Sequence, residues 1–134
     1  MHTAANRQQT TVLIVDDDPF MRELLTETLG ALGVTTVHNA ANGRAAMQWL
    51  RAAPGIPSLL ISDIYMPDMD GFEFISALAD MRYPGKVLLC SGVSVESLAL
   101  ARDVAEGMGV ALAGVLSKPL DATTLAEILN NNGL

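Results

Sequence analysis

The residues of this chain with the clearest capacity for chemistry are carboxylates, a hydroxyl and an ammonium, each at the end of a short apolar run. They are Asp16, Asp17, Asp63, Ser91 and Lys118. Carboxylates that crowd together repel one another and resist joint ionisation, and a hard divalent cation such as Mg²⁺ relieves this by accepting oxygen ligands. If the apolar runs end at one place, these residues predict an acidic metal site with a lysine and a hydroxyl beside it.

Five β-favouring runs alternate with five segments of helical hydrophobic spacing, and these elements would have to position the reactive side chains. The runs cover residues 11–15, 35–38, 58–62, 86–91 and 112–117, and the helical segments cover 19–32, 43–53, 71–82, 95–108 and 122–131. Strict alternation of strand and helix indicates a parallel sheet with helices on both faces. Such sheets place their sites at the carboxyl ends of the strands. We therefore predict an α/β fold that gathers the reactive residues at one edge.

Helix-start signals agree with this division of the chain. The predicted N-caps are Asp18, Asn42, Asp70, Ser94 and Asp121. Pro19 fits the first position of a helix, and Glu73 follows Asp70 at the spacing of a capping box. These signals place a helix start directly after two of the acidic segments.

Length, charge and cysteine content restrict the classes of function. The chain has 134 residues, which suits one domain, and a net charge of −7, which argues against direct binding of nucleic acid or of anionic membranes. The single cysteine, Cys90, excludes an internal disulfide and is expected to be a small buried hydrophobe. No apolar run approaches a membrane span, and the polar start "MHTAANRQQ" lacks the apolar core of a signal peptide. We expect a cytoplasmic protein with a flexible N-terminal arm over residues 1–10.

Some of the reactive residues also fit ordinary structural roles. Ser91 could be a polar loop residue, and Lys118 could be a solvated surface lysine. Caps do not account for Asp16, Asp17 and Asp63 together, because a helix start needs one acid and not three at a single edge.

At this point the motifs resemble a known family, the receiver domains of two-component response regulators. The matching segments are "LIVDDD" (13–18), "DIYMPDMDG" (63–71), "CSG" (90–92) and "LSKPL" (116–120). The resemblance covers about residues 11–131. It implies a flavodoxin-like (βα)5 fold with strand order 2-1-3-4-5, and a receiver domain over residues 11–134.

The resemblance also implies roles for the acids. Asp63 matches the phosphoacceptor, which takes a phosphoryl group from a histidine kinase or a phosphotransfer protein. Asp17 resembles the direct Mg²⁺ ligand, and Asp16 resembles its neighbour, which acts mainly through water. The backbone carbonyl of Tyr65 matches the third protein ligand.

The remaining motif residues match the parts that hold and report the phosphate. Lys118 would bind one phosphoryl oxygen and Ser91 another, and Pro119 matches a position with a cis Lys-Pro bond. The chain departs from the family at Val115, where many members carry Tyr or Phe. We therefore expect the switch to work by displacement of the loop after Ser91 and of the following helix.

The expected partners follow from the same resemblance. Phe20, Met21 and Leu24, just after the acidic cluster, are the predicted docking residues for the kinase. An output domain beyond this chain, or a homodimer through the fourth helix and fifth strand, is the expected route of output. The segment that ends in "LAGVLSKPL" resembles receivers joined to cyclic-di-GMP phosphodiesterase domains.

Three other interpretations remain open at this stage. A Mg²⁺-dependent phosphatase of the haloacid-dehalogenase type would also use an aspartyl phosphate, and Asp16 and Asp18 meet its D-x-D pattern. An electron-transfer flavoprotein lacks support, because no phosphate-binding loop follows the first strand. A receiver that only binds partners would have no need of the acids and Lys118. We favour a phosphoacceptor that promotes its own phosphorylation and dephosphorylation and is no enzyme for separate substrates.

Overall fold

The computed structural model describes residues 7–53, 55–64, 71–92, 95–118 and 120–134. These residues form a parallel sheet of five strands in the order β2-β1-β3-β4-β5. The strands are β1 (Thr11–Val15), β2 (Thr36–Ala40), β3 (Leu59–Asp63), β4 (Lys86–Ser91) and β5 (Leu112–Ser117). The helices are α2 (Pro19–Ala31), α3 (Gly43–Ala52), α4 (Gly71–Asp80), α5 (Val95–Gly107) and α6 (Ala122–Asn131). The predicted fold and strand order are confirmed.

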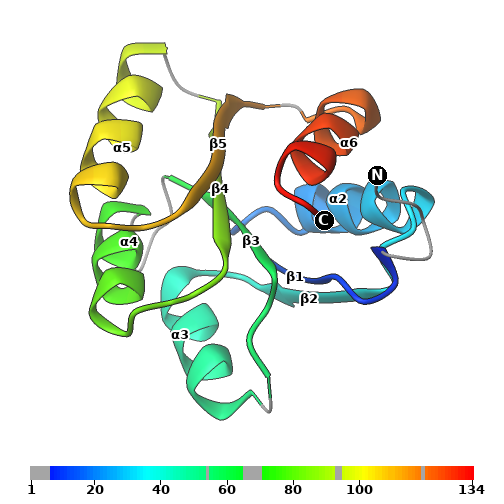
Figure 1. Ribbon diagram of the computed structural model, residues 1–134, viewed down its shortest axis with the longest axis horizontal. Helices are drawn as coiled ribbons and strands as arrows, with labels where there is room; N and C mark the ends of the chain where they lie inside the picture. The colour runs from blue at the N-terminus through cyan, green and yellow to red at the C-terminus, as the bar shows by residue number, and fades with distance from the viewer. Residues whose placement is uncertain (1–6, 54, 65–70, 93–94, 119) are drawn as a thin grey trace.

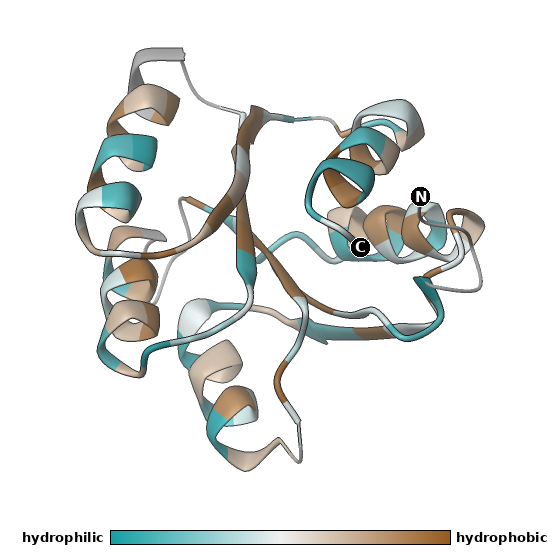
Figure 2. Cartoon of the chain, in the orientation of Figure 1, coloured by the Kyte–Doolittle hydropathy of each residue, from teal (hydrophilic) through white to brown (hydrophobic). Residues whose placement is uncertain are grey.

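The helices form two layers, one on each face of the sheet. Helices α2 and α6 lie on one face, and α3, α4 and α5 lie on the other (Figure 1). Alternate residues of β1 point to opposite layers, with Leu13 in one apolar cluster and Ile14 in the other. This explains why the central strands are continuous apolar runs: both of their faces are covered (Figure 2).

The helices and strands end close to the predicted positions, and the differences have local causes. The second strand runs to Ala40 and not to residue 38, because His38 and Asn39 continue the parallel pairing with β1. As an edge strand it can carry polar residues whose side chains meet solvent. Helix α3 stops at Ala52 because Ala53 is extended and precedes a proline, which disfavours helical backbone in the residue before it.

Side-chain caps begin three of the helices as predicted. The Asp18 carboxylate accepts from the Phe20 amide at 2.9 Å, Asn42 caps α3, and Asp121 accepts from the Thr124 amide at 2.7 Å. The predicted caps Asp70 and Ser94 lie outside the described residues. Each observed cap satisfies an amide that the helix itself leaves without a partner.

Two residues of the expected arm, Arg7 and Thr10, are buried against the domain, while Gln8 and Gln9 between them are exposed. Arg7 is 9% exposed, and its guanidinium donates to the Leu32 carbonyl at 3.1 Å, to Asn130 Oδ1 at 2.5 Å and to the Leu134 carbonyl at 3.5 Å. Helices α2 and α6 have no basic residue in their last turns, so this arginine supplies the cation that both carboxyl ends favour. We call this set of contacts the Arg7 clamp.

No helix among the described residues has both the length and the apolar character needed to span a bilayer.

Candidate functional site

Four strand ends bring the predicted reactive residues to one edge of the sheet. Asp16 directly follows β1, Asp63 ends β3, Ser91 ends β4 and Lys118 directly follows β5. The Lys118 amide donates to the Ser91 carbonyl at 2.9 Å, which extends the ladder between the last two strands to the site. The parallel topology therefore assembles groups that are more than a hundred residues apart in sequence.

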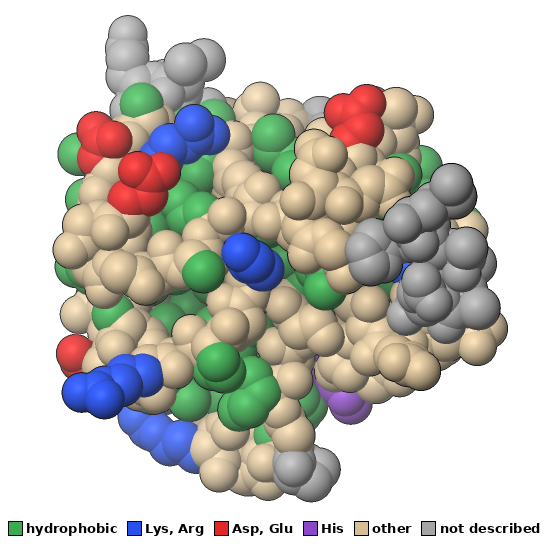
Figure 3. Space-filling view, viewed as in Figure 1, with side chains coloured by type: hydrophobic (Ala, Val, Ile, Leu, Met, Phe, Trp, Pro, Cys, Tyr) green, Lys and Arg blue, Asp and Glu red, His purple; other side chains and the backbone are tan. Residues whose placement is uncertain are grey.

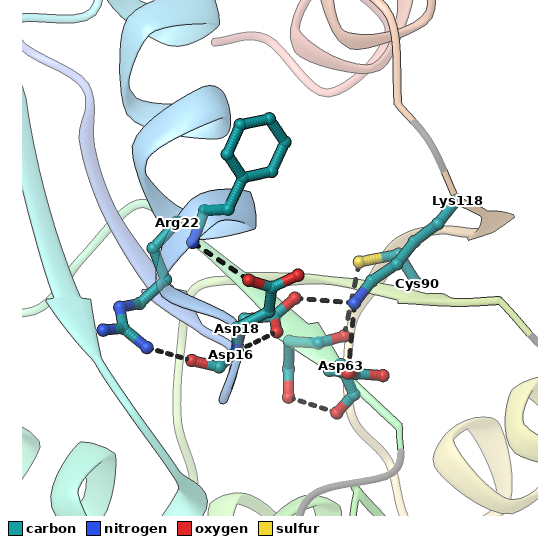
Figure 4. Close-up of polar contacts among 8 residues, drawn as sticks. Asp16, Asp18, Arg22, Asp63, Cys90 and Lys118 are labelled. Atoms are coloured by element: carbon teal, nitrogen blue, oxygen red, sulfur yellow. Dashed lines mark hydrogen bonds and ion pairs between the residues drawn. The ribbon is translucent and has the colours of Figure 1, made fainter.

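Lys118 joins the acids of two strands (Figure 4). Its Nζ lies 2.7 Å from Asp16 Oδ2 and 3.1 Å from Asp63 Oδ2. Burial of the ammonium lowers its pKa, but the hydrogen bonds and charges of Asp16 and Asp63 outweigh burial, so the pKa of Lys118 is raised overall. The lysine stays charged at neutral pH. Its two ion pairs exclude the alternative interpretation of Lys118 as a solvated surface lysine.

Asp16 is buried, and hydrogen bonds engage both its backbone and its side chain. It is 1% exposed, its Oδ1 accepts from the Asp18 amide at 2.9 Å, and its own amide donates to the Ala40 carbonyl at 3.1 Å. Its carbonyl accepts from Arg22 Nη1 at 2.7 Å. Arg22 is a site residue that the sequence pattern did not indicate, because its partner is a backbone oxygen that any residue could supply.

The carboxylates form a candidate metal site. Asp16, Asp17 and Asp63 each offer an oxygen, and these oxygens lie within 4.8 Å of one another. Asp17 is exposed while the other two are buried, so a cation could reach the group from solvent and keep water ligands on that side. An all-oxygen donor set of this kind fits Mg²⁺. Tyr65, the predicted backbone ligand, lies outside the described residues.

The remaining predicted site residues divide into those the structure describes and one that it does not. Ser91 is 2% exposed at the end of β4. Val115 is buried in β5 and lines a cavity of about 260 Å³ together with Leu98, Ala99, Arg102 and Asp103. Pro119, the predicted cis residue, is outside the described residues.

Cys90 beside the site behaves as a buried hydrophobe, as predicted. Its thiol lies 3.7 Å from the Ser62 carbonyl, to which it can donate. Burial raises the pKa of Cys90 to about 12, although the nearby Lys118 acts in the opposite direction. The group stays a neutral thiol and is no nucleophile at physiological pH.

The three predicted docking residues differ in exposure. Phe20 is 69% exposed in the first turn of α2, while Met21 and Leu24 are half-buried. Met21 packs against the apolar cluster between α2, α6 and the sheet. Phe20 is thus a large, exposed apolar side chain at the start of the helix that follows the acidic Asp16–Asp18 segment.

Known proteins match both the sequence and the fold. Residues 12–130 match the family model of the response regulator receiver domain. The chemotaxis protein CheY of Thermotoga maritima is 29% identical over 119 residues, which cover 89% of this chain and 93% of that protein. Response regulator Rre1 of Synechocystis is 33% identical over 122 residues, which cover 90% of this chain but only 50% of the relative.

Solved structures agree. The chemotaxis protein CheY4 of Vibrio cholerae has a TM-score of 0.75 at 30% identity, with 91% of this chain and 97% of that chain covered. The response regulator TrrA of Thermotoga maritima, solved in complex with Mg²⁺ and BeF, has a TM-score of 0.75 at 27% identity, with 92% and 99% covered. With this fold and these strand ends, the chain belongs to the response regulator receiver domain family and is a phosphorylation-controlled signalling switch.

Proposed function

We propose that Asp63 is the residue that accepts the phosphoryl group. The observation that carries this is its position: it is a buried carboxylate at the end of β3, 3.1 Å from Lys118 Nζ and within the acidic cluster. An oxygen of Asp63 would attack phosphorus while the phosphorus–nitrogen bond of a phosphohistidine breaks. The electron pair returns to the imidazole nitrogen, and Asp63 becomes an acyl phosphate.

The neighbouring residues would stabilise this transfer. Mg²⁺ bound by Asp16, Asp17 and Asp63 would neutralise charge on the phosphoryl oxygens. Lys118 already contacts Asp63 and would follow the new charge to one oxygen. The Ser91 hydroxyl, at the end of the adjacent strand, would donate to another.

The direct test is labelling with acetyl phosphate followed by mass measurement. Asp63→Asn should abolish the Mg²⁺-dependent gain in mass, and Asp17→Ala should weaken Mg²⁺ binding and slow the labelling. Asp103→Asn, an exposed acid on α5, is the matched control and should label as the parent does. Full labelling of the Asp63→Asn protein would overturn the assignment.

The same experiment separates this proposal from the alternatives. A phosphatase would turn over many phosphoester molecules, whereas a receiver keeps one label per chain. A D-x-D phosphatase would use Asp16 as nucleophile, so Asp63→Asn would leave its phosphorylation intact, whereas it should abolish the label of a receiver. A receiver that only binds partners would take no label at all.

The proposed phosphodonor is a histidine kinase or a phosphotransfer protein in the cytoplasm, and it would dock on the start of α2. A phosphohistidine must reach Asp63, so the donor must cover the rim on which Phe20 stands exposed. Burial of a large apolar side chain at such a rim favours association.

A double variant, Phe20→Ala with Met21→Ala, should slow transfer from a phosphohistidine donor and leave labelling by acetyl phosphate unchanged. Leu100→Ala, which removes an exposed apolar side chain on α5, is the control. Equal transfer rates for the double variant and the parent would refute this docking face.

We further propose that output leaves through the surface of α5 and β5. Arg102 and Asp103 flank the cavity at Val115, and charged side chains lie over α5 beside apolar surface that faces β5 (Figure 3). An output domain beyond this chain, or a second copy, would use this surface. Relatives such as Rre1 are about twice as long as the matched region, which is consistent with an additional domain.

A further inference from the structure

Arg22 reaches the acidic site through the main chain. Its Nη1 donates to the Asp16 carbonyl at 2.7 Å from the first turns of α2 (Figure 4). This carbonyl belongs to the peptide group that links Asp16 to Asp17. The contact therefore acts on the connection between a buried acid and an exposed one.

The other polar groups of Asp16 are already engaged. Its amide donates to Ala40, and its two carboxylate oxygens accept from the Asp18 amide and from Lys118. These bonds fix the residue but not the rotation of the peptide that follows it. A peptide group is planar, so the direction of its carbonyl sets the direction in which Asp17 leaves.

Unlike Lys118, Arg22 does not contact the carboxylate oxygens that could bind a cation. Within the described part of the chain, the ion pairs of the cluster are made by Lys118, and the Arg22 guanidinium bonds to a carbonyl. A guanidinium is always charged, so it adds positive potential close to three acids. It leaves the Asp16 and Asp63 oxygens to a cation, but its like charge repels that cation, so a gain in Mg²⁺ affinity from Arg22 has to come from the hydrogen bond to the carbonyl.

We propose that Arg22 is a positioning residue for Mg²⁺ binding: it holds the Asp16–Asp17 peptide so that the Asp17 carboxylate faces the other two acids. This inference rests on the metal site proposed above. Groups that orient a metal ligand commonly change metal affinity by about 10- to 100-fold when they are removed. Arg22 lies one turn into α2, so it also links the start of that helix to the site.

The test is calorimetric titration of the unphosphorylated protein with Mg²⁺. Arg22→Met removes the donor and the charge at similar length and should raise the Mg²⁺ dissociation constant about tenfold. Arg22→Lys keeps a charged donor, and Arg22→Gln keeps a neutral one, so both should recover part of the affinity. Arg44→Met, an exposed arginine on α3, should bind as the parent does.

Acetyl-phosphate labelling at saturating Mg²⁺ provides the second measurement. The Arg22→Met protein should then reach the parent's labelling, since the acids and Lys118 remain.

Parent-like Mg²⁺ affinity in Arg22→Met, or loss in all three variants without any recovery by Lys or Gln, would overturn the inference. Failure of the parent itself to bind Mg²⁺ would instead overturn the proposed metal site. If Arg22→Met does not fold, Arg22→Ala takes its place, and parent-like Mg²⁺ affinity in Arg22→Ala refutes the role.

Discussion

Lys118 holds two buried carboxylates that come from different strands, and this makes it a structural residue as well as a chemical one. Asp16 is 1% exposed and Asp63 is 8% exposed. Removal of one partner from a buried ion pair leaves a charge without compensation, which costs far more than the pair itself contributes. The stability of the unphosphorylated domain therefore depends on Lys118.

We predict that Lys118→Met lowers the free energy of unfolding by about 3 kcal/mol in the absence of Mg²⁺. Added Mg²⁺ should reduce the difference in unfolding free energy between the variant and the parent. A cation bound by the acids replaces the lost positive charge and stabilises the folded state by mass action. Urea denaturation with and without Mg²⁺ measures both effects.

The matched control is Lys86→Met, at the start of β4 and at the opposite end of the strand from the site. Parent-like stability of Lys118→Met without Mg²⁺ would contradict the prediction. The pH should be neutral in these measurements. The pKa of Lys118 is raised above its ordinary 10.5, so its contribution is complete below that value and is lost only as pH rises beyond it.

The sequence could predict the residues that act through side chains, and it missed those that act on the backbone. Asp16, Asp63 and Lys118 are special because a charged group at the end of a buried strand is rare and leaves a visible pattern. Arg22 and Arg7 bind carbonyl oxygens. Every residue has such an oxygen, so these contacts exist only in the folded arrangement.

At the scale of elements, the central strands were predictable and the edges less so. Strands β1 and β4 have the predicted limits, because both of their faces are covered, and β3 is displaced by one residue, to Leu59–Asp63 from the predicted 58–62. The end of β2 is set instead by its partner, since His38 and Asn39 pair with Leu13 and Ile14 of β1. Tertiary pairing therefore overrides local preference at the edge.

The elements that should move on phosphorylation are α5 and β5. Val115 is small and stiff at χ1, so it cannot swing inward as an aromatic ring would. A phosphoryl group shifts the balance between two conformations only through contacts that differ between them, and here those contacts would be Ser91 and Lys118. Both residues stand at the ends of strands next to this helix and strand pair.

We predict that beryllofluoride with Mg²⁺ changes amide hydrogen exchange in residues 95–117 as well as at the site. Exchange reports the local opening of hydrogen-bonded segments, so it detects displacement of a helix without an aromatic probe. The Asp63→Asn protein under the same conditions is the control and should show no change. Changes limited to residues that touch the phosphoryl group would refute this surface as the output.

At the scale of the whole molecule, the helix layers on the two faces of the sheet differ in the contacts that they make. Helices α2 and α6 share one face of the sheet (Figure 1). The Arg7 clamp contacts the carboxyl ends of both helices. The face with α5 carries the cavity at Val115 and the proposed output surface. The helices of one face are thus held together at their carboxyl ends, and the other face carries the surface that we propose changes on phosphorylation.

The Arg7 clamp also brings the two ends of the described chain together. Its Nε lies 3.5 Å from the Leu134 carbonyl although 127 positions separate the two residues. A short flexible linker could therefore join residue 134 to residue 7 with little loss of entropy on closure. The two ends of the described chain lie close together, so a cut in a surface loop would leave the strand pairings that build the site intact.

Circular permutation is the consequence. A permutant with joined ends and a new opening between Gly55 and Ile56, both exposed in the loop before β3, should fold and take one phosphoryl label, because every strand pairing survives. An opening between Leu13 and Ile14, inside β1, should prevent folding, because this strand lies between two others. If the loop permutant fails to fold, the proximity of the two chain ends is not sufficient for permutation, and the prediction is wrong. If it folds, the phosphoacceptor strand leads the chain, and the site depends on which strands are neighbours rather than on which comes first.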